Sequence, residues 1–205
     1  MRGLRFGLVL GVALLAAACL PVTTTVPVGT TVGLSADPGL IGTWKVIPQK
    51  EKNGKTDDGG PGYIHFIVAK DGIMTALAIS TGKLAPEKSE GDWSVFAASA
   101  TTLGGHHYLN VRPTFDSGKA ATDKDARNIP MLYRFGHRGR LTLYMIGEDA
   151  AAAAIKAGKI EGIVDQDKFG DVTITAPADK LDAFLASKDG AALFTEKLLE
   201  MKRVR

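Results

Sequence analysis

The stretch Tyr63-Ile-His-Phe-Ile-Val-Ala-Lys-Asp-Gly-Ile-Met-Thr-Ala-Leu-Ala-Ile-Ser80 decides the fold class of this chain. At its centre, Asp71-Gly72 separates two runs that are rich in apolar and β-branched residues. An Asp-Gly pair between such runs is the strongest short-range signal for a β-hairpin. The stretch therefore predicts two antiparallel strands joined by a two-residue turn.

A two-residue turn also predicts the register of the hairpin. It pairs Phe66 with Leu77 and Ile64 with Ile79, so that these side chains share one nearly all-apolar face. The opposite face carries Tyr63, His65, Ile67 and Ala69 opposite Ser80, Ala78, Ala76 and Met74. Such a contrast is typical of an antiparallel sheet that buries one side.

Further strand-like segments lie on both sides of this hairpin, at the spacing of an antiparallel meander. They are residues 40–47, 92–98, 106–112, 129–135, 140–146, 159–164, 172–175 and 198–204. An Ala-rich segment over 148–157 begins with acids and is followed by Gly158, which predicts a helix. A second helix is predicted after Pro177, where Leu181, Phe184 and Leu185 form an i, i+3, i+4 stripe.

These elements predict a mainly β fold, an antiparallel meander closing into a barrel of about 8–10 strands with two short helices in the C-terminal third. The tripeptide Gly42-Thr43-Trp44 on the first strand of such a meander resembles the lipocalin-like (calycin) barrels. The resemblance implies one β-barrel-like domain over residues 40–205. The chain departs from that family in lacking its Thr-Asp-x-x-Tyr turn and in placing the helices before and between the last strands.

The N-terminus has the pattern of a secretory signal over residues 1–18. Arg2 and Arg5 precede an apolar run over 8–15, and small residues follow. The uncharged run over residues 6–20 is shorter than the ~18 residues that span a bilayer, so no transmembrane helix is predicted.

The tetrapeptide Ala16-Ala17-Ala18-Cys19 resembles the bacterial lipobox, although Ala16 stands where that pattern usually has Leu. The resemblance implies that Cys19 receives a diacylglyceryl thioether, becomes the mature N-terminus and anchors the protein by acyl chains such as palmitate. Because Leu20 is not Asp, it implies the outer membrane, with the protein facing the periplasm. The alternative is a plain signal peptide that ends near an unmodified, buried cysteine.

Residues 19–39 are rich in Thr, Val, Pro and Gly and carry only one charge, Asp37. They show neither helical periodicity nor strand alternation. We expect a lipidated N-terminus followed by a flexible extended linker, which would reach about 60 Å in a polyproline conformation.

The composition excludes several classes of function. Loss of Arg2 and Arg5 with the signal lowers the net charge from +3 to +1. A charge this small gives no positive electrostatic field that would attract nucleic acid, so nucleic-acid binding is not predicted. Cys19 is the only cysteine, so no disulfide and no thiol chemistry are expected in the body. No cofactor-binding motif is found, and no cofactor is predicted.

The candidate ligand-binding residues are those expected to line a barrel interior, where a small ligand could lie. They are Trp44, Phe66, Leu77, Ile79, Trp93 and His107. Core packing is the alternative for each of them. His107 is expected on an apolar face, as a hydrogen-bonded histidine more readily than as a metal ligand. The loop over 165–171 departs from a calcium-binding loop, and no metal site is predicted.

The sequence therefore predicts a non-catalytic, lipid-anchored protein of the cell envelope, held to the membrane by its anchor. The first hypothesis is binding of a small apolar or amphipathic ligand. The second is a structural or interaction role with an envelope protein partner and a filled core. The third is an uncharacterised hydrolase, since glycosidase-type carboxylates leave no local motif; no catalytic residue is predicted.

Overall fold

The computed structural model describes residues 21–48, 62–68, 73–80, 92–116, 119–121, 127–165 and 171–204. The expected signal peptide, Cys19 and the Asp71-Gly72 turn lie outside these ranges. So do the central residues of the loop over 165–171.

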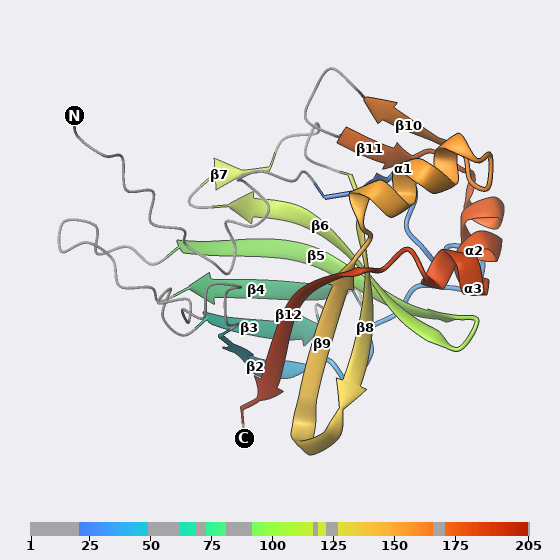
Figure 1. Ribbon diagram of the computed structural model, residues 1–205. Helices are drawn as coiled ribbons and strands as arrows, with labels where there is room; N and C mark the ends of the chain where they lie inside the picture. The colour runs from blue at the N-terminus through green and yellow to red at the C-terminus, as the bar shows by residue number, and fades with distance from the viewer. Residues whose placement is uncertain are drawn as a thin grey trace, which may run out of the picture.

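Within the described residues, eight antiparallel strands close into a barrel (Figure 1). They are β2 (Gly42–Ile47), β3 (Gly62–Val68), β4 (Met74–Ser80), β5 (Asp92–Leu103), β6 (His106–Asp116), β8 (Ile129–Gly136), β9 (Arg140–Met145) and β12 (Glu196–Arg203). Each strand pairs with the next in this order, and β12 pairs with β2 to close the ring. The short β7 (Lys119–Ala120) pairs antiparallel with the end of β6. The predicted fold class, an antiparallel meander barrel, is confirmed.

A second layer covers part of the outside of the barrel (Figure 1). Its elements are the small sheet of β1 (Thr23–Thr24), β11 (Asp171–Ile174) and β10 (Gly162–Asp165), with α1 (Glu148–Lys156), α2 (Ala178–Ala186) and α3 (Lys188–Ala191). The two predicted helices are present. The two short strands predicted between them form this separate sheet instead of joining the barrel. A short 3-10 turn, η3 (His137–Gly139), joins β8 to β9.

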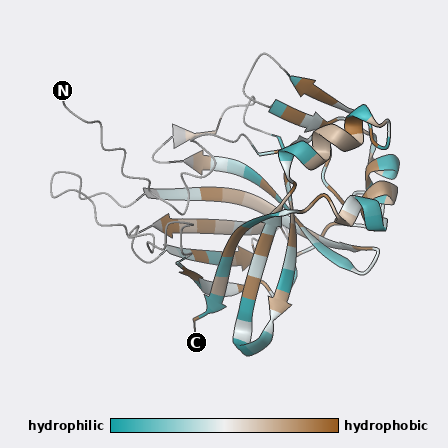
Figure 2. Cartoon of the chain, viewed as in Figure 1, coloured by the Kyte–Doolittle hydropathy of each residue, from teal (hydrophilic) through white to brown (hydrophobic). Residues whose placement is uncertain are grey.

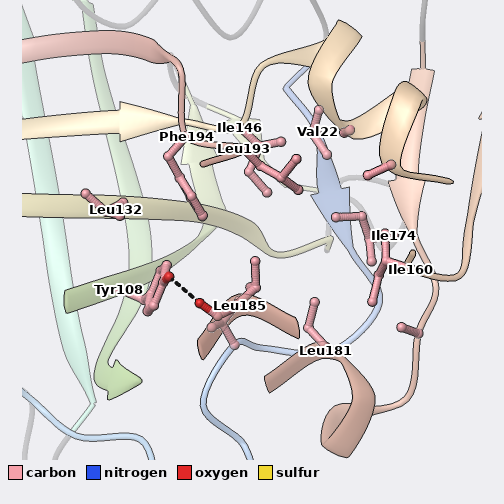
Figure 3. Packing of buried hydrophobic residues seen from close by; sticks show 14 of the residues in the cluster. Val22, Tyr108, Leu132, Ile146, Ile160, Ile174, Leu181, Leu185, Leu193 and Phe194 are labelled. Atoms are coloured by element: carbon pink, nitrogen blue, oxygen red, sulfur yellow. Dashed lines mark hydrogen bonds between the residues drawn. The ribbon is translucent and has the colours of Figure 1, made fainter. Parts of the chain in front are cut away.

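The molecule accordingly has two hydrophobic cores. The inner core lies inside the barrel and takes buried side chains from all eight strands, among them Trp44, Phe66, Leu109, Tyr133 and Met201. The outer core lies between the barrel wall and the covering layer (Figure 3). Its buried residues include Tyr108 and Leu132 from the wall and Ile174, Leu181 and Leu185 from the cover.

The segment over 21–41, which we call the N-terminal strap, is not the free linker that the sequence predicts. Val22 is 4% exposed and Val28 is fully buried, both in the outer core. Thr23 and Thr24 pair in parallel with Thr173 and Ile174 of β11. The apolar residues of this segment are therefore part of the folded domain.

Two buried polar side chains from distant elements hold the strap in place. The side chain of Asn110 accepts a hydrogen bond from the Val28 N–H at 2.7 Å and donates one to the Val28 carbonyl at 2.9 Å. Asp182 of α2 accepts from the Gly29 N–H at 2.6 Å and from the Thr31 N–H and hydroxyl at 2.9 and 2.6 Å. These bonds satisfy backbone groups that lack a sheet partner, and they offset the cost of burying the polar side chains.

The predicted register of the first hairpin is wrong by one residue. Phe66 lies opposite Ala76 and Ile64 opposite Ala78. A shift of one residue moves every side chain of a strand to the other face. Met74, Ala76 and Ala78 therefore face the barrel interior, and they are buried. The small side chains of Ala76 and Ala78 leave room for Trp44, Phe66 and Tyr133, because an eight-stranded barrel is only wide enough to be filled by its own side chains.

Candidate functional site on the outer surface of the barrel

The interior of the barrel is packed where the structure describes it. Trp44 and Phe66 are each 1% exposed and belong to the inner core. Ala76, Ala98 and Ala100 are the small residues of that core, and they compensate for its large aromatic side chains.

The strap closes one end of this interior. Leu40 is fully buried in the inner core, and its carbonyl accepts a hydrogen bond from the Trp44 indole at 2.6 Å. The Tyr133 hydroxyl donates to Asp37 at 2.5 Å. Burial raises the pKa of Tyr133 well above its usual range, and the hydrogen bond to the Asp37 carboxylate and its charge raise it further. Tyr133 therefore stays protonated and holds the strap at all ordinary pH values.

Arg203 near the end of β12 completes this closure. Its guanidinium lies over the Trp44 ring, 4.4 Å from the centroid, in cation–π geometry. It also donates hydrogen bonds to the carbonyls of Gly39 and Ile41, the second at 2.6 Å. The last barrel strand thus fastens the end of the strap, and every polar group of this cluster is used structurally.

The structure does not bring the predicted ligand-binding residues together. Trp44 and Phe66 point into the packed interior. Leu77, Ile79 and Trp93 lie on the outer surface, because the observed register turns them outward. Ile79 is 36% exposed and Trp93 is 39% exposed.

His107 lies at the end of β6 with its side chain exposed. It shares the register row of Tyr133, and the two rings stack with centroids 5.4 Å apart. A hydrogen bond of 3.1 Å joins its Nδ1 to the Thr102 hydroxyl. This agrees with a hydrogen-bonded histidine at the rim of the barrel, although not with one buried in a pocket.

An uncharged face occupies the outside of β3, β4 and the first half of β5. We define it by the outward side chains of those strands. They are Tyr63, His65, Ile67, Thr75, Leu77, Ile79, Trp93, Val95 and Ala97. None is formally charged at neutral pH, and Figure 2 shows β4 and β5 without strongly hydrophilic bands in this region. Trp93 stacks on Phe115 of β6 with ring centroids 4.7 Å apart.

No described element covers this face. The covering layer lies over β6, β8 and the second half of β5 (Figure 1). Large apolar side chains that are left exposed side by side are typical of a contact surface.

A cavity of about 320 Å³ lies beside the uncharged face, between the strap and the outer wall of β5 and β6. Pro27, Leu34, Ile73 and Ala97 supply apolar walls, and Asn128 and Arg112 supply polar groups. Arg112 lies opposite Ala97 in the register, and its side chain is exposed. No ion pair joins it to an acid among the described residues. The groove therefore combines apolar walls with one available cation.

The outside of β9, β12 and β2 has the opposite character. It carries four cations, Lys45, Arg140, Lys197 and Lys202, around one acid, Glu200. Hydrogen bonds from Lys197 and Arg140 hold the pKa of the Glu200 carboxyl below its usual range. Charged side chains of this kind are well solvated, and their ion pairs contribute little to stability.

The described residues contain no group of three or more His, Cys, Asp or Glu side chains that could hold a metal ion. Their most buried acid, Asp182, has its oxygens committed to the strap. Every buried side-chain nitrogen or oxygen that the structure describes has a hydrogen-bond partner. The strongest candidate site is therefore a surface, the uncharged face with the groove at its margin.

Comparison with family models, with curated proteins and with solved structures found no significant match for this chain. No helix in the described part of the chain is long and apolar enough to cross a membrane.

Sequence reasoning missed the uncharged face, although a signal for it existed. The three strands β3, β4 and β5 contain one formally charged residue between them, Asp92. A sheet with one face in water normally alternates apolar and charged residues. Because both faces of these strands lack charged residues, the sequence alone could have indicated a second apolar surface. The observed register places that surface on the outside of the barrel.

Proposed function

We propose that this chain is a lipid-anchored lipoprotein of the bacterial cell envelope that acts without catalysis, through contacts of its outer surface. The observation that supports this best is where the apolar residues lie. The inner core occupies the barrel with the chain's own side chains, whereas Ile67, Ile79 and Trp93 are exposed outside. A barrel interior that is packed where the structure describes it favours the structural and interaction role over a carrier with its ligand inside.

The anchor in this proposal is Cys19, at the end of a secretory signal over residues 1–18 with small residues before the cysteine. The lack of Asp after Cys19 favours the outer membrane, with the domain facing the periplasm. The barrel is lipocalin-like in architecture, and Gly42-Thr43-Trp44 on its first strand agrees with that likeness.

Replacing the anchor residue tests the proposal. In Cys19→Ala, we expect no incorporation of labelled acyl chains, and we expect most of the protein to leave the membrane fraction. Leu20→Ala is the matched control, because it keeps the cysteine and the small residues before it, and it should stay labelled. Acyl label on Cys19→Ala, or no label on the unaltered chain, would refute the lipoprotein.

The groove beside the strap favours a second candidate function, the binding of a small amphipathic molecule. Its volume of about 320 Å³ lies at the lower end of the range for ligand sites. Arg112 would pair with an anionic head, and Leu34 and Ile73 would contact an apolar tail. This ligand would lie outside the barrel, in contrast to the interior site predicted from the sequence.

Extraction of the purified protein followed by mass spectrometry tests the groove. A stoichiometric anionic amphiphile should be recovered, and Arg112→Gln should reduce its recovery about tenfold or more, since a charge-assisted hydrogen bond contributes about 1.5–3 kcal/mol. Lys45→Gln, which removes a cation from the charged surface, is the control and should retain the ligand. Recovery of no ligand from the unaltered protein would exclude this second function.

A further inference from the structure

We infer that the uncharged face lies against the membrane surface to which the chain is anchored, with Arg112 at the lipid phosphates. This inference rests on the proposed lipid anchor at Cys19. It adds which side of the domain meets the bilayer, and it makes the lipid headgroups and the upper acyl chains the partner of the face.

The first argument is the short distance between the anchor and the folded domain. Val22 is 4% exposed in the outer core and is only three residues beyond Cys19. Three extended residues span at most about 11 Å. A lipidated Cys19 therefore leaves no long spacer, and one side of the domain must lie at the headgroups.

The second argument is where the chain joins the domain. Thr24 and Asn128 exchange two backbone hydrogen bonds, of 2.9 and 3.3 Å. Asn128 lines the groove together with Arg112 and Ala97, and Ala97 belongs to the uncharged face. Since neighbouring strands lie about 5 Å apart, the face extends over about 15 to 20 Å from this point. Of the surfaces described, it is the apolar one beside the anchor.

The third argument is the chemistry of the face. Ile67 and Ile79 are 45% and 36% exposed, and aliphatic side chains of this kind enter the boundary between headgroups and acyl chains. Trp93 and Tyr63 have the amphipathic rings that are enriched at that depth. The Arg112 guanidinium at the margin matches the geometry of a phosphate.

Tethering also favours the membrane over a protein partner. A lipid anchor a few residues away holds the face at a high effective concentration next to the bilayer, so weak apolar contacts are enough to seat it. The charged surface of β9, β12 and β2 is a poorer fit, because none of the exposed large hydrophobic side chains of the described residues lies on those three strands. A protein that covers the uncharged face is the competing occupant, and the experiment below separates the two.

The chain provides its own reporter, because it has two tryptophans in opposite surroundings. Trp44 is 1% exposed in the interior, and Trp93 is 39% exposed on the face. The lipidated protein is placed in vesicles of phosphatidylethanolamine with a minor fraction of phosphatidylglycerol whose acyl chains are brominated. In Trp44→Phe, we expect the emission of Trp93 to shift to the blue on insertion and to be strongly quenched by the bromines.

Two control variants define the baseline. Trp93→Phe leaves the interior Trp44, which should be quenched several-fold less. Thr142→Trp in a Trp44→Phe, Trp93→Phe background places the reporter on β9, opposite Arg134 and Glu200. It should stay open to acrylamide in water and should not be quenched by the bromines. Arg112→Gln should weaken the quenching of Trp93 about fivefold at most, the effect of losing one cation near an anionic surface.

The outcomes separate this inference from the proposed function. Mass spectrometry of the N-terminal peptide shows whether Cys19 carries acyl chains, which tests the anchor alone. If Cys19 is lipidated but Trp93 is quenched by acrylamide as readily as Thr142→Trp, the membrane contact is refuted and the lipoprotein stands. If Trp93 is shielded from both acrylamide and brominated lipid, a protein or a second copy covers the face, and the inference is likewise overturned.

Discussion

The two apolar regions on the outside of this barrel differ in what covers them. Over β6, β8 and the second half of β5, the outward residues Tyr108 and Leu132 are buried beneath the strap and the helices. Over β3, β4 and the first half of β5, the outward residues Ile67, Ile79 and Trp93 stay exposed, and no described segment lies on them. Figure 1 shows the covering layer on one side of the barrel only. The same kind of wall is thus internal core in one region and free surface in the other.

Two segments that are far apart in the sequence together cover one region of the barrel, whereas none covers the other among the described residues. The strap meets residues 148–165 and 171–195 over β6, where Tyr108 donates a hydrogen bond of 2.7 Å to the Leu185 carbonyl (Figure 3). Polar groups are satisfied there and apolar ones are packed, as in a protein interior. The outward side chains of the uncovered region are apolar enough to be buried, but no described segment of the chain covers them. We therefore assign this region a partner.

The largest expected effect comes from truncating one aliphatic side chain in each region. Leu185→Ala removes a fully buried side chain of the outer core and should lower the free energy of unfolding by about 2–5 kcal/mol. Ile79→Ala on the uncharged face should lower it by less than about 1 kcal/mol, because Ile79 is already 36% exposed. Denaturant unfolding of the two variants measures the difference. Equal losses would mean that the uncharged face is packed as tightly as the covered one.

A smaller effect should follow from releasing the strap. Asp182→Ala removes the acceptor of three hydrogen bonds and leaves the buried Gly29 N–H without a partner. We expect a loss of about 1–3 kcal/mol and faster amide exchange over residues 21–41. Asp179→Ala, on the exposed side of the same helix, is the control: loss of this first-turn acid should cost at most about 1 kcal/mol and should leave amide exchange over residues 21–41 unchanged. Unchanged exchange in Asp182→Ala would show that the apolar residues hold the strap without the carboxylate.

The third effect is absent at neutral pH: it is a dependence of stability on alkaline pH that reports on the covered region. Burial raises the pKa of Tyr108 from 10.0 to about 12. The folded state therefore holds this proton more tightly than the unfolded state does. The stability linked to Tyr108 is complete below the unfolded pKa and is lost as the pH rises through about 12. Over that interval the free energy of unfolding should fall by about 1.4 kcal/mol per pH unit from this group.

Tyrosinate absorbance and stability measured from neutral to alkaline pH would test this. Tyr108→Phe should remove one late-titrating tyrosine and this part of the pH dependence. A Tyr108 that ionises like a tyrosine in water would mean that the cover over β6 opens readily. The distinction between the two regions would then be smaller than the structure indicates.

Much of the fold could be predicted from local patterns. The Asp71-Gly72 signal and the alternating runs indicated an antiparallel meander, and the Ala-rich segment gave α1, where Gly147 is the N-cap and Glu148 and Asp149 lie in the first turn. Apolar spacing likewise gave α2, with Leu181 and Leu185 fully buried. In each case neighbouring residues along the chain carry the signal.

The strap could not be predicted in this way, because its partners are far along the chain. Residues 21–41 have no period of their own. Asn110 and Asp182, which hold the strap, lie 82 and 153 residues beyond the backbone groups that they bind. A run of Thr, Val, Pro and Gly predicts a linker, because nothing in the run itself indicates that Asn110 and Asp182 will bind its backbone.

The candidate site was missed for a related reason. Both faces of β4 are apolar, with Met74, Ala76 and Ala78 on one side and Leu77 and Ile79 on the other. Hydropathy therefore gives no preference between the two registers. The predicted one placed Leu77 and Ile79 in a ligand pocket, whereas the observed one places them outside.

The sequence by itself determined the mainly β class, the antiparallel order of neighbouring strands and the two helices, because each depends on residues close together in the chain. The pattern from which we propose the secretory signal and the lipid anchor at Cys19 is likewise local in the sequence. Only the tertiary structure decided which face of β4 points inward, because the small Ala76 and Ala78 on that face leave room in the narrow barrel for Trp44 and Phe66. That choice left Ile79 and Trp93 outside and turned a predicted ligand pocket into an uncovered surface.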